Sequence, residues 1–216
     1  MLERKGFIRK KVIERKENYF YQPLLSMQSY YITFSDSCQE FEKGKLNEQY
    51  QNWGNVFSIE FDIMITKLPI SEWMNVFHFT GTNGNCCGIG DRIPALFINK
   101  AGYFHFTMAI NNNGNYQKNI DFELGETYHV TIQQSIIGDK FWYEILINDE
   151  SKLKLENSNP KTFSSVHLYT SDSWYESFTS DFGTVCDLKI QQEAGKLGCW
   201  VYKWRPSLLK PSSSSR

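Results

Sequence analysis

Two acidic residues share one face of a predicted strand, Val56–Ile65. Side chains alternate across a strand, so the apolar positions face the core while Glu60 and Asp62 face the other way. The predicted core positions of this strand are Ile59, Phe61, Ile63 and Ile65. Two carboxylates about 5–5.5 Å apart can act as nucleophile and acid in a retaining glycosidase. They can also accept hydrogen bonds from a ligand, so Glu60 and Asp62 are candidate ligand-binding residues.

A second candidate site consists of aromatic and amide side chains in predicted loops. A sugar stacks its apolar face on an aromatic ring, while its hydroxyls need polar partners. The candidate ligand-binding residues of this kind are Trp174, Tyr175, Asp172, Asn111 and Asn113. Trp174 lies in a loop rich in Ser and Asp, which favours exposure. Trp73 is a weaker candidate, because large aromatic residues are usually well buried, and we expect it to pack in the core or between sheets.

The same loops contain the candidate ligands of a metal ion. Calcium takes six to eight oxygen ligands from carboxylates, amides and carbonyls. If the loops converge, Asp91, Asn111 and Asp172 are the best candidates, although two carboxylates make a weak site. In the alternative interpretation, Asp91 pairs with Arg92 to hold its loop and Asp172 caps a turn. Calcium is the one cofactor that the sequence suggests.

The remaining residues that could carry chemistry favour structural roles. His78, His105, His129 and His167 lie in four different predicted strands. We expect each to be partly buried and hydrogen-bonded rather than catalytic or metal-binding. The glycines between residues 81 and 90 lack the strand–GxxxxGK–helix context of a phosphate-binding loop.

Short alternating runs separated by turn residues predict an antiparallel all-β fold with two stacked sheets. The predicted strands are Tyr30–Phe34, Val56–Ile65, Asn75–Thr80, Ala95–Ile98, Tyr103–Ile110, Thr127–Gln133, Lys140–Ile147, Lys152–Leu155, Ser164–Thr170 and Gly183–Ile190. Turns are expected at 99–102, 137–140 and 148–150, and the run Asn111–Asn115 is expected to be a loop.

Composition divides the chain into three predicted parts. Residues 1–28 form a basic arm, residues 29–191 the sandwich, and residues 192–216 a flexible extension rich in Gly, Pro and Ser. The net charge of −1 favours neither nucleic acid nor an anionic membrane as partner. No run approaches the roughly 18–20 apolar residues of a membrane helix. The N-terminus has the positive flank of a secretory signal without an apolar region behind it.

The five cysteines match neither zinc-ligand spacing nor a CxxC redox site. For a secreted chain, a disulfide of Cys186 with either Cys38 or Cys87 is conceivable. We expect Cys86 and Cys87 not to bridge each other, because neighbouring Cβ atoms on a trans backbone point apart.

With the strands in order, several runs resemble concanavalin-like lectin domains of the laminin-G-like type. The runs are 75–80, 90–97, 103–106, 126–130, 143–149, 166–174 and 183–190, the last resembling a closing strand that pairs with the first. The resemblance implies a jelly-roll sandwich, ligand binding at rim loops or on the concave sheet, and an extracellular location. Cys186 stands where this family favours a small or polar residue.

Glu60 and Asp62 also resemble the first two acids of the E-x-D-x-x-E run of laminarinase-like β-glucanases. The place of the third acid holds Met64 or Ile65, and neither transfers a proton. We therefore expect a non-catalytic binding module for a glycan or an extracellular protein. The alternatives are an adhesion or spacer domain of a larger protein and, less favoured, a β-glucanase-like hydrolase.

Overall fold

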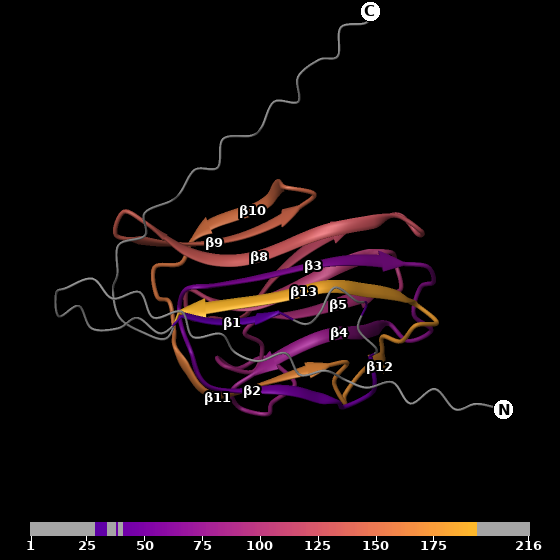
Figure 1. The fold of residues 1–216 in the computed structure, drawn as a ribbon, viewed down its shortest axis with the longest axis horizontal. Helices are drawn as coiled ribbons and strands as arrows, with labels where there is room; N and C mark the ends of the chain where they lie inside the picture. Colours follow the sequence, from indigo (N-terminus) through magenta and orange to yellow (C-terminus); the bar gives the residue numbers. More distant parts are fainter. Residues whose placement is uncertain (1–28, 34–37, 39–40, 194–216) are drawn as a thin grey trace, which may run out of the picture.

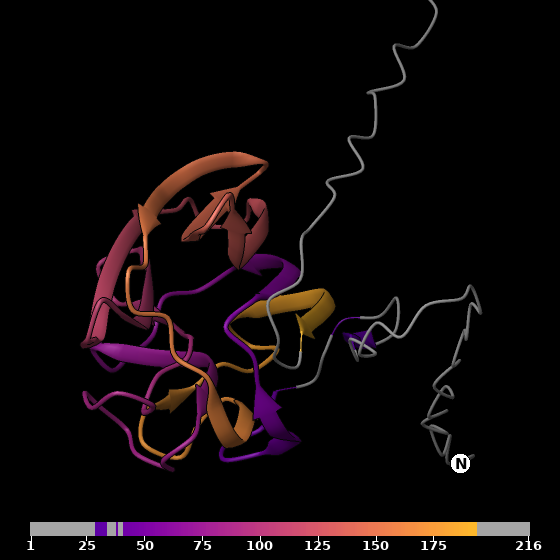
Figure 2. The same cartoon turned by 90° about the vertical axis from the view of Figure 1, so that its left-hand side faces the viewer.

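The chain forms a two-layered β-sandwich in a computed structural model, which describes residues 29–33, 38 and 41–193. Figures 1 and 2 show two sheets stacked face to face, and this part of the chain contains thirteen strands and no helix. The two-sheet all-β architecture predicted from the sequence is confirmed. The predicted basic arm and nearly all of the predicted extension lie outside the described residues.

Each sheet is held by antiparallel neighbours, except that β12 pairs with β4 in parallel. Sheet A contains, in spatial order, β1 (Ser29–Thr33), β13 (Gly183–Glu193), β3 (Phe57–Ile65), β8 (Thr127–Ile137), β9 (Lys140–Ile147) and β10 (Glu150–Glu156). Sheet B contains β2 (Leu46–Trp53), β11 (Phe163–Thr170), β4 (Trp73–Thr80), β5 (Ala95–Asn99), β6 (Tyr103–Ile110) and β7 (Asn113–Asp121), with β12 (Glu176–Ser177) beside β4. The closing strand β13 pairs with β1 as expected.

The core lies between the two sheets and follows the alternation of residue types. In β3 the four predicted core positions, Ile59, Phe61, Ile63 and Ile65, are buried. Phe61 meets Phe77 of sheet B edge to face, with ring centroids 5.4 Å apart, a geometry that aromatic pairs prefer. Glu60 and Asp62 therefore face away from sheet B.

Three strands of sheet B are absent from the predicted list. β2 and β7 are edge strands of mostly polar residues, and β12 has only two residues. The prediction that Asn111–Asn115 is a loop is wrong for its second half, since the turn is confined to Asn111 and Asn112 and β7 begins at Asn113. Both turn residues have positive φ, which Asn tolerates better than most residues.

The cysteines form two disulfides in the described residues. Cys38 bonds to Cys186, which was one of the two predicted alternatives. Cys86 bonds to Cys87, so the prediction that these neighbours do not bridge is wrong. It assumed a trans peptide, whereas the bond between them is cis and their Cα atoms are 3.2 Å apart.

Within the described residues, no helix is long or apolar enough to span a membrane.

Candidate functional site

Two loops lie on the outer face of sheet B. The central strands β4, β5 and β6 are buried along nearly their whole length on both faces. An antiparallel sheet with one face in solvent would instead show alternating buried and exposed residues. The inner side chains of these strands fill the core. On the outer face, residues 81–92, which follow β4, and residues 171–175, which follow β11, contact His78 of β4 and Phe97 of β5. We call these two segments the covering loops.

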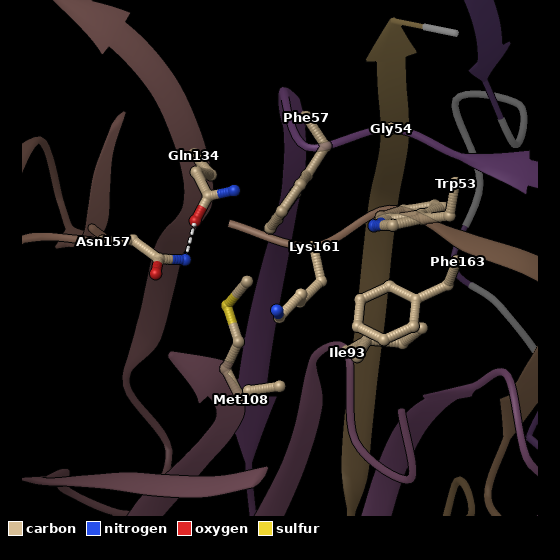
Figure 3. Close-up of a pocket in the computed structure, with 10 residues that line it drawn as sticks. Trp53, Gly54, Phe57, Ile93, Met108, Gln134, Asn157, Lys161 and Phe163 are labelled. Carbon is tan, nitrogen blue, oxygen red and sulfur yellow. Dashed lines mark hydrogen bonds between the residues drawn. The ribbon is translucent and has the colours of Figure 1, made fainter. Parts of the chain in front are cut away.

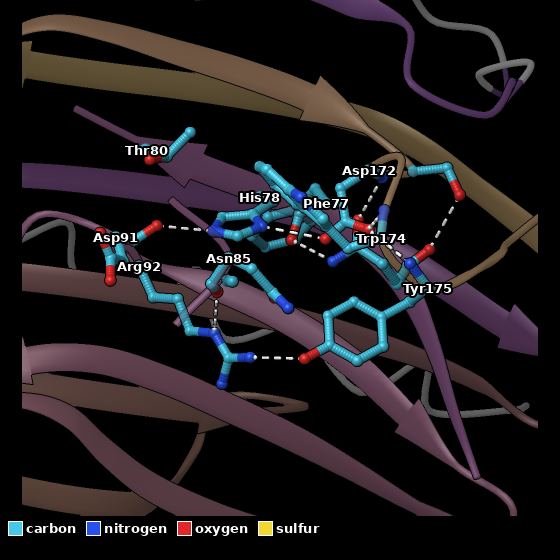
Figure 4. Close-up of polar contacts among 12 residues, drawn as sticks. Phe77, His78, Thr80, Asn85, Asp91, Arg92, Asp172, Trp174 and Tyr175 are labelled. Carbon is cyan, nitrogen blue, oxygen red and sulfur yellow. Dashed lines mark hydrogen bonds and ion pairs between the residues drawn. The ribbon is translucent and has the colours of Figure 1, made fainter. Parts of the chain in front are cut away.

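His78 of β4 connects the two covering loops. Its Nδ1 lies 2.9 Å from Oδ2 of Asp172, and its Nε2 lies 2.6 Å from the main-chain oxygen of Asp91. Both His78 and Asp172 have side chains with no solvent exposure. Figure 4 shows the imidazole between the two loops, with one nitrogen directed at each. The outer surface of β4 is thus bonded to both loops through one ring.

Asp172 caps the turn that carries Trp174. Its Oδ1 accepts hydrogen bonds from the main-chain N–H groups of Trp174 and Tyr175, each 3.1 Å away. Its own N–H donates to the side-chain oxygen of Asn75 at 2.8 Å. The sequence-based alternative that Asp172 caps a turn is confirmed, and the cap fixes the main chain of Trp174 over His78.

Arg92 joins the covering loops a second time. Its guanidinium donates to the main-chain oxygen of Asn85 at 2.9 Å, to Asn115 of β7 at 2.9 Å and to the Tyr175 hydroxyl at 3.0 Å. It also lies over the Phe97 ring, 4.7 Å from the centroid. Burial lowers the pKa of Arg92 from its ordinary value. Arg92 therefore holds its loop through these bonds, rather than through the ion pair with Asp91 that was considered from the sequence.

The ring contacts continue across sheet B to β6. His105 lies 4.6 Å from Trp73 between ring centroids, and its Nδ1 lies 2.6 Å from Oδ1 of Asn119. Burial lowers the pKa of His105. Trp73 was expected in the core or between the sheets, which is wrong: it is half-buried on the outer face, against His105 and Tyr103. The pleat directs it outward because it precedes the inward-facing Met74.

The exposed part of this face is centred on Trp174. Trp174 is 41% exposed, its ring is 5.5 Å from that of His78, and the Tyr169 ring meets it edge to face at 6.5 Å. Next to Tyr169 on β11, His167 has its Nδ1 2.6 Å from Oδ1 of Asn83 in the covering loop. We call Trp174, Tyr169, His167 and Asn83 the Trp174 surface.

The other candidate ligand-binding residues lie elsewhere. Glu60 and Asp62 are on the outer face of sheet A, on the far side of the sandwich, where Glu60 accepts from Ser58 and Asp62 contacts His129 at 2.7 Å. Asn111 is bonded to the segment 156–158, and the side chain of Asn113 accepts from the N–H of Asn115. Of the predicted set, the fold brings together Trp174, Tyr175 and Asp172.

The three candidate calcium ligands do not fit an ion. The Asp91 carboxylate accepts from Thr82 and from the N–H of Gly88, and the Asp172 carboxylate is occupied by the bonds described above. Asn111 Oδ1 accepts from both the N–H and the hydroxyl of Ser158. Among the described residues, no cluster of three or more His, Cys, Asp or Glu side chains can hold a metal. We therefore assign calcium no role at these residues.

A small, partly open pocket lies away from the Trp174 surface. Trp53, Met108, Gln134, Lys161 and Phe163 are among its lining residues (Figure 3), and its volume is about 10 Å³. That is room for about one water molecule. This pocket is therefore too small for a sugar-sized ligand.

Most of the hydrogen bonds that hold this site together could not be predicted from the sequence. His78 was expected only to be buried and hydrogen-bonded, which is confirmed, as it is for His105. Its link to Asp172 joins residues 94 positions apart, and that of Arg92 to Tyr175 spans 83 positions. Without the strand order, no local pattern predicts such pairs.

Comparisons with known proteins give distant likenesses. No protein-family model and no curated protein matches the sequence. Among solved structures, the receptor-binding domain of botulinum neurotoxin D is 14% identical, with a TM-score of 0.48 over 76% of this chain and 44% of that one. A SAP-like pentraxin from Limulus polyphemus is 14% identical, with a TM-score of 0.45 over 70% of this chain and 73% of that one.

A sialidase from Trypanosoma rangeli is also 14% identical, with a TM-score of 0.43 over 62% of this chain. This chain spans only 20% of that sialidase and 44% of the toxin domain. No functional argument follows from likenesses at this level. The finer resemblance to laminin-G-like domains stays a prediction.

Proposed function

We propose that this domain is a non-catalytic binding module that recognises a glycan through the Trp174 surface. The single observation that supports this most is a large aromatic residue, Trp174, that is 41% exposed and whose main-chain N–H is bonded to Asp172. Large, rigid aromatic side chains supply contact area at a low cost in conformational entropy. A ring held in one position is therefore suited to stack against a sugar.

The residues beside Trp174 supply the polar part of a sugar site. Tyr169 and His167 are half-buried on β11, and Asn83 and Ser173 are exposed in the covering loops. Hydroxyl, imidazole and amide groups can each bond a sugar hydroxyl. Leu46, 48% exposed, pairs with Tyr169 across the strands and extends the apolar part of the surface.

The first prediction concerns Trp174. On an array of immobilised glycans, Trp174→Ala should lower binding about tenfold or more. Aromatic residues that become buried when the ligand binds commonly contribute over about 1.4 kcal/mol to affinity. Trp174→Tyr keeps an aromatic face and should retain part of the binding.

The matched control is Leu124→Ala, which removes a side chain that is 51% exposed in the β7–β8 loop. It should bind as the unchanged protein does. If the unchanged protein binds no glycan, or if Trp174→Ala binds equally well, the proposal is wrong. Absence of glycan binding would favour a protein partner or a spacer role, and equal binding by Trp174→Ala would place the glycan site elsewhere on the domain.

A further inference from the structure

The surroundings of His78 determine how many protons its ring carries. Both partner atoms, Oδ2 of Asp172 and the main-chain oxygen of Asp91, are acceptors. A neutral imidazole has one N–H donor and one acceptor nitrogen, whereas an imidazolium has two donors. With a neutral ring and an ionised Asp172, one of these two short contacts would join two lone pairs in a site without solvent.

One additional proton resolves this conflict, and the geometry places it on His78. Oδ1 of Asp172 accepts two main-chain N–H groups, and Oδ2 faces His78 as the acceptor of a third hydrogen bond. The titratable or charged residues around His78 are Tyr169 on β11, Asp172 and Tyr175 in one covering loop, and Asp91 and Arg92 in the other. β5 contributes Ala95 and Phe97, which do not titrate.

We propose that His78 is a positioning residue that holds Trp174 in its binding orientation as an imidazolium, so that ligand binding at the Trp174 surface is lost as the pH rises. While the ring carries both protons, both bonds form and both covering loops are attached to β4. When the proton leaves, one bond becomes repulsive and its loop is released. The effect on binding rests on the proposed function, whereas the protonation of His78 does not.

The state of the ring can be measured without any ligand. In ¹⁵N-labelled full-length protein, both ring nitrogens of His78 should show the protonated signature at about neutral pH, with the signal assigned by comparison with His78→Gln. As the pH is raised to about 9, the amide signals of Trp174 and Tyr175 should shift together with the ring signals. A neutral ring at neutral pH, or amides that ignore the titration, would overturn the inference.

Asp172→Asn tests the same point by conservative substitution. Its amide can donate to an unprotonated Nδ1, while its oxygen still accepts the N–H groups of Trp174 and Tyr175. The variant should therefore keep the Trp174 amide signal unchanged over the pH range in which the unchanged protein shifts. The matched control is Asp62→Asn, at the exposed His129–Asp62 pair on sheet A, which should leave the titration of Trp174 as it was.

The glycan array then separates the two proposals. The unchanged protein should lose about tenfold or more of its binding between about pH 6 and about pH 9, and Asp172→Asn should lose much less. If the ring and amides titrate as expected but no glycan binds at any pH, the proposed function fails while the role of His78 stands. If glycans bind equally at both pH values, the role of His78 fails instead. If Asp172→Asn does not fold, the measurements on the unchanged protein still decide.

Discussion

Two tyrosine hydroxyls in the core have no hydrogen-bond partner among the described residues, those of Tyr50 and Tyr143. Burial raises the pKa of both, because the charged form has no access to water. A buried polar group without a partner costs about 1–3 kcal/mol. These hydroxyls therefore reduce the stability of the folded state.

Tyr143→Phe should consequently raise the free energy of unfolding by about 1 kcal/mol, because it keeps the ring and removes the unpaired group. Urea denaturation followed by circular dichroism measures the change. Tyr103→Phe is the control, since Tyr103 is only half-buried and is not a core residue. A loss of stability in Tyr143→Phe would show that the hydroxyl has a partner, such as an internal water.

At the scale of single residues, the sequence identified exposed chemistry better than buried chemistry. Trp174 was identified because its loop is rich in Ser and Asp, and its exposure is confirmed. His78 and Arg92 could not be assigned their roles, because their partners are set by the pairing of β4 with β11 and by the path of the covering loops. Alternation along a strand indicates which way a side chain points, but not what covers it.

At the scale of elements, the sequence predicted the strands that alternate and missed those that do not. Each of the ten predicted strands corresponds to a described strand, with ends that differ by a few residues. β2 and β7 form the edges of sheet B, so fewer of their side chains are buried and their residues are largely polar. An edge strand with this composition resembles a loop in sequence, although its polar side chains also discourage pairing with other molecules.

Gly114 of β7 allows the covering loop 81–92 to approach. A Cβ at Gly114 would lie 2.5 Å from the main-chain oxygen of Cys87 and from the carbonyl carbon of Gly88. Gly114→Ala should therefore displace the loop and lower the free energy of unfolding by about 1–3 kcal/mol, the usual cost of overpacking. Gly81→Ala is the matched control, because its nearest new contact is 3.6 Å, an ordinary van der Waals distance. Equal stability of the two variants in urea would show that the loop tolerates displacement at no cost.

At the scale of the whole molecule, the strands of the described chain build one core, and most of the contacts between them join residues that are distant in sequence. Sheet A alone combines its first strand with its last, β1 with β13, and sheet B begins with β2 beside β11. The sandwich class was predictable from composition and alternation. The order of strands within the sheets was not, because short turns determine only the pairs that are adjacent in sequence.

The Cys38–Cys186 disulfide closes the longest covalent loop in the described residues, with a sequence separation of 148. A cross-link stabilises a protein mainly by restricting the unfolded chain, and more so for longer loops. The double variant Cys38→Ser/Cys186→Ser should therefore lose about 2–4 kcal/mol in its free energy of unfolding. Cys86→Ser/Cys87→Ser is the matched control, because a bridge between adjacent residues restricts almost none of the unfolded chain. Urea denaturation of both variants measures the difference. A larger loss in the control would mean that the covering loop, rather than the long-range cross-link, contributes the greater share of stability.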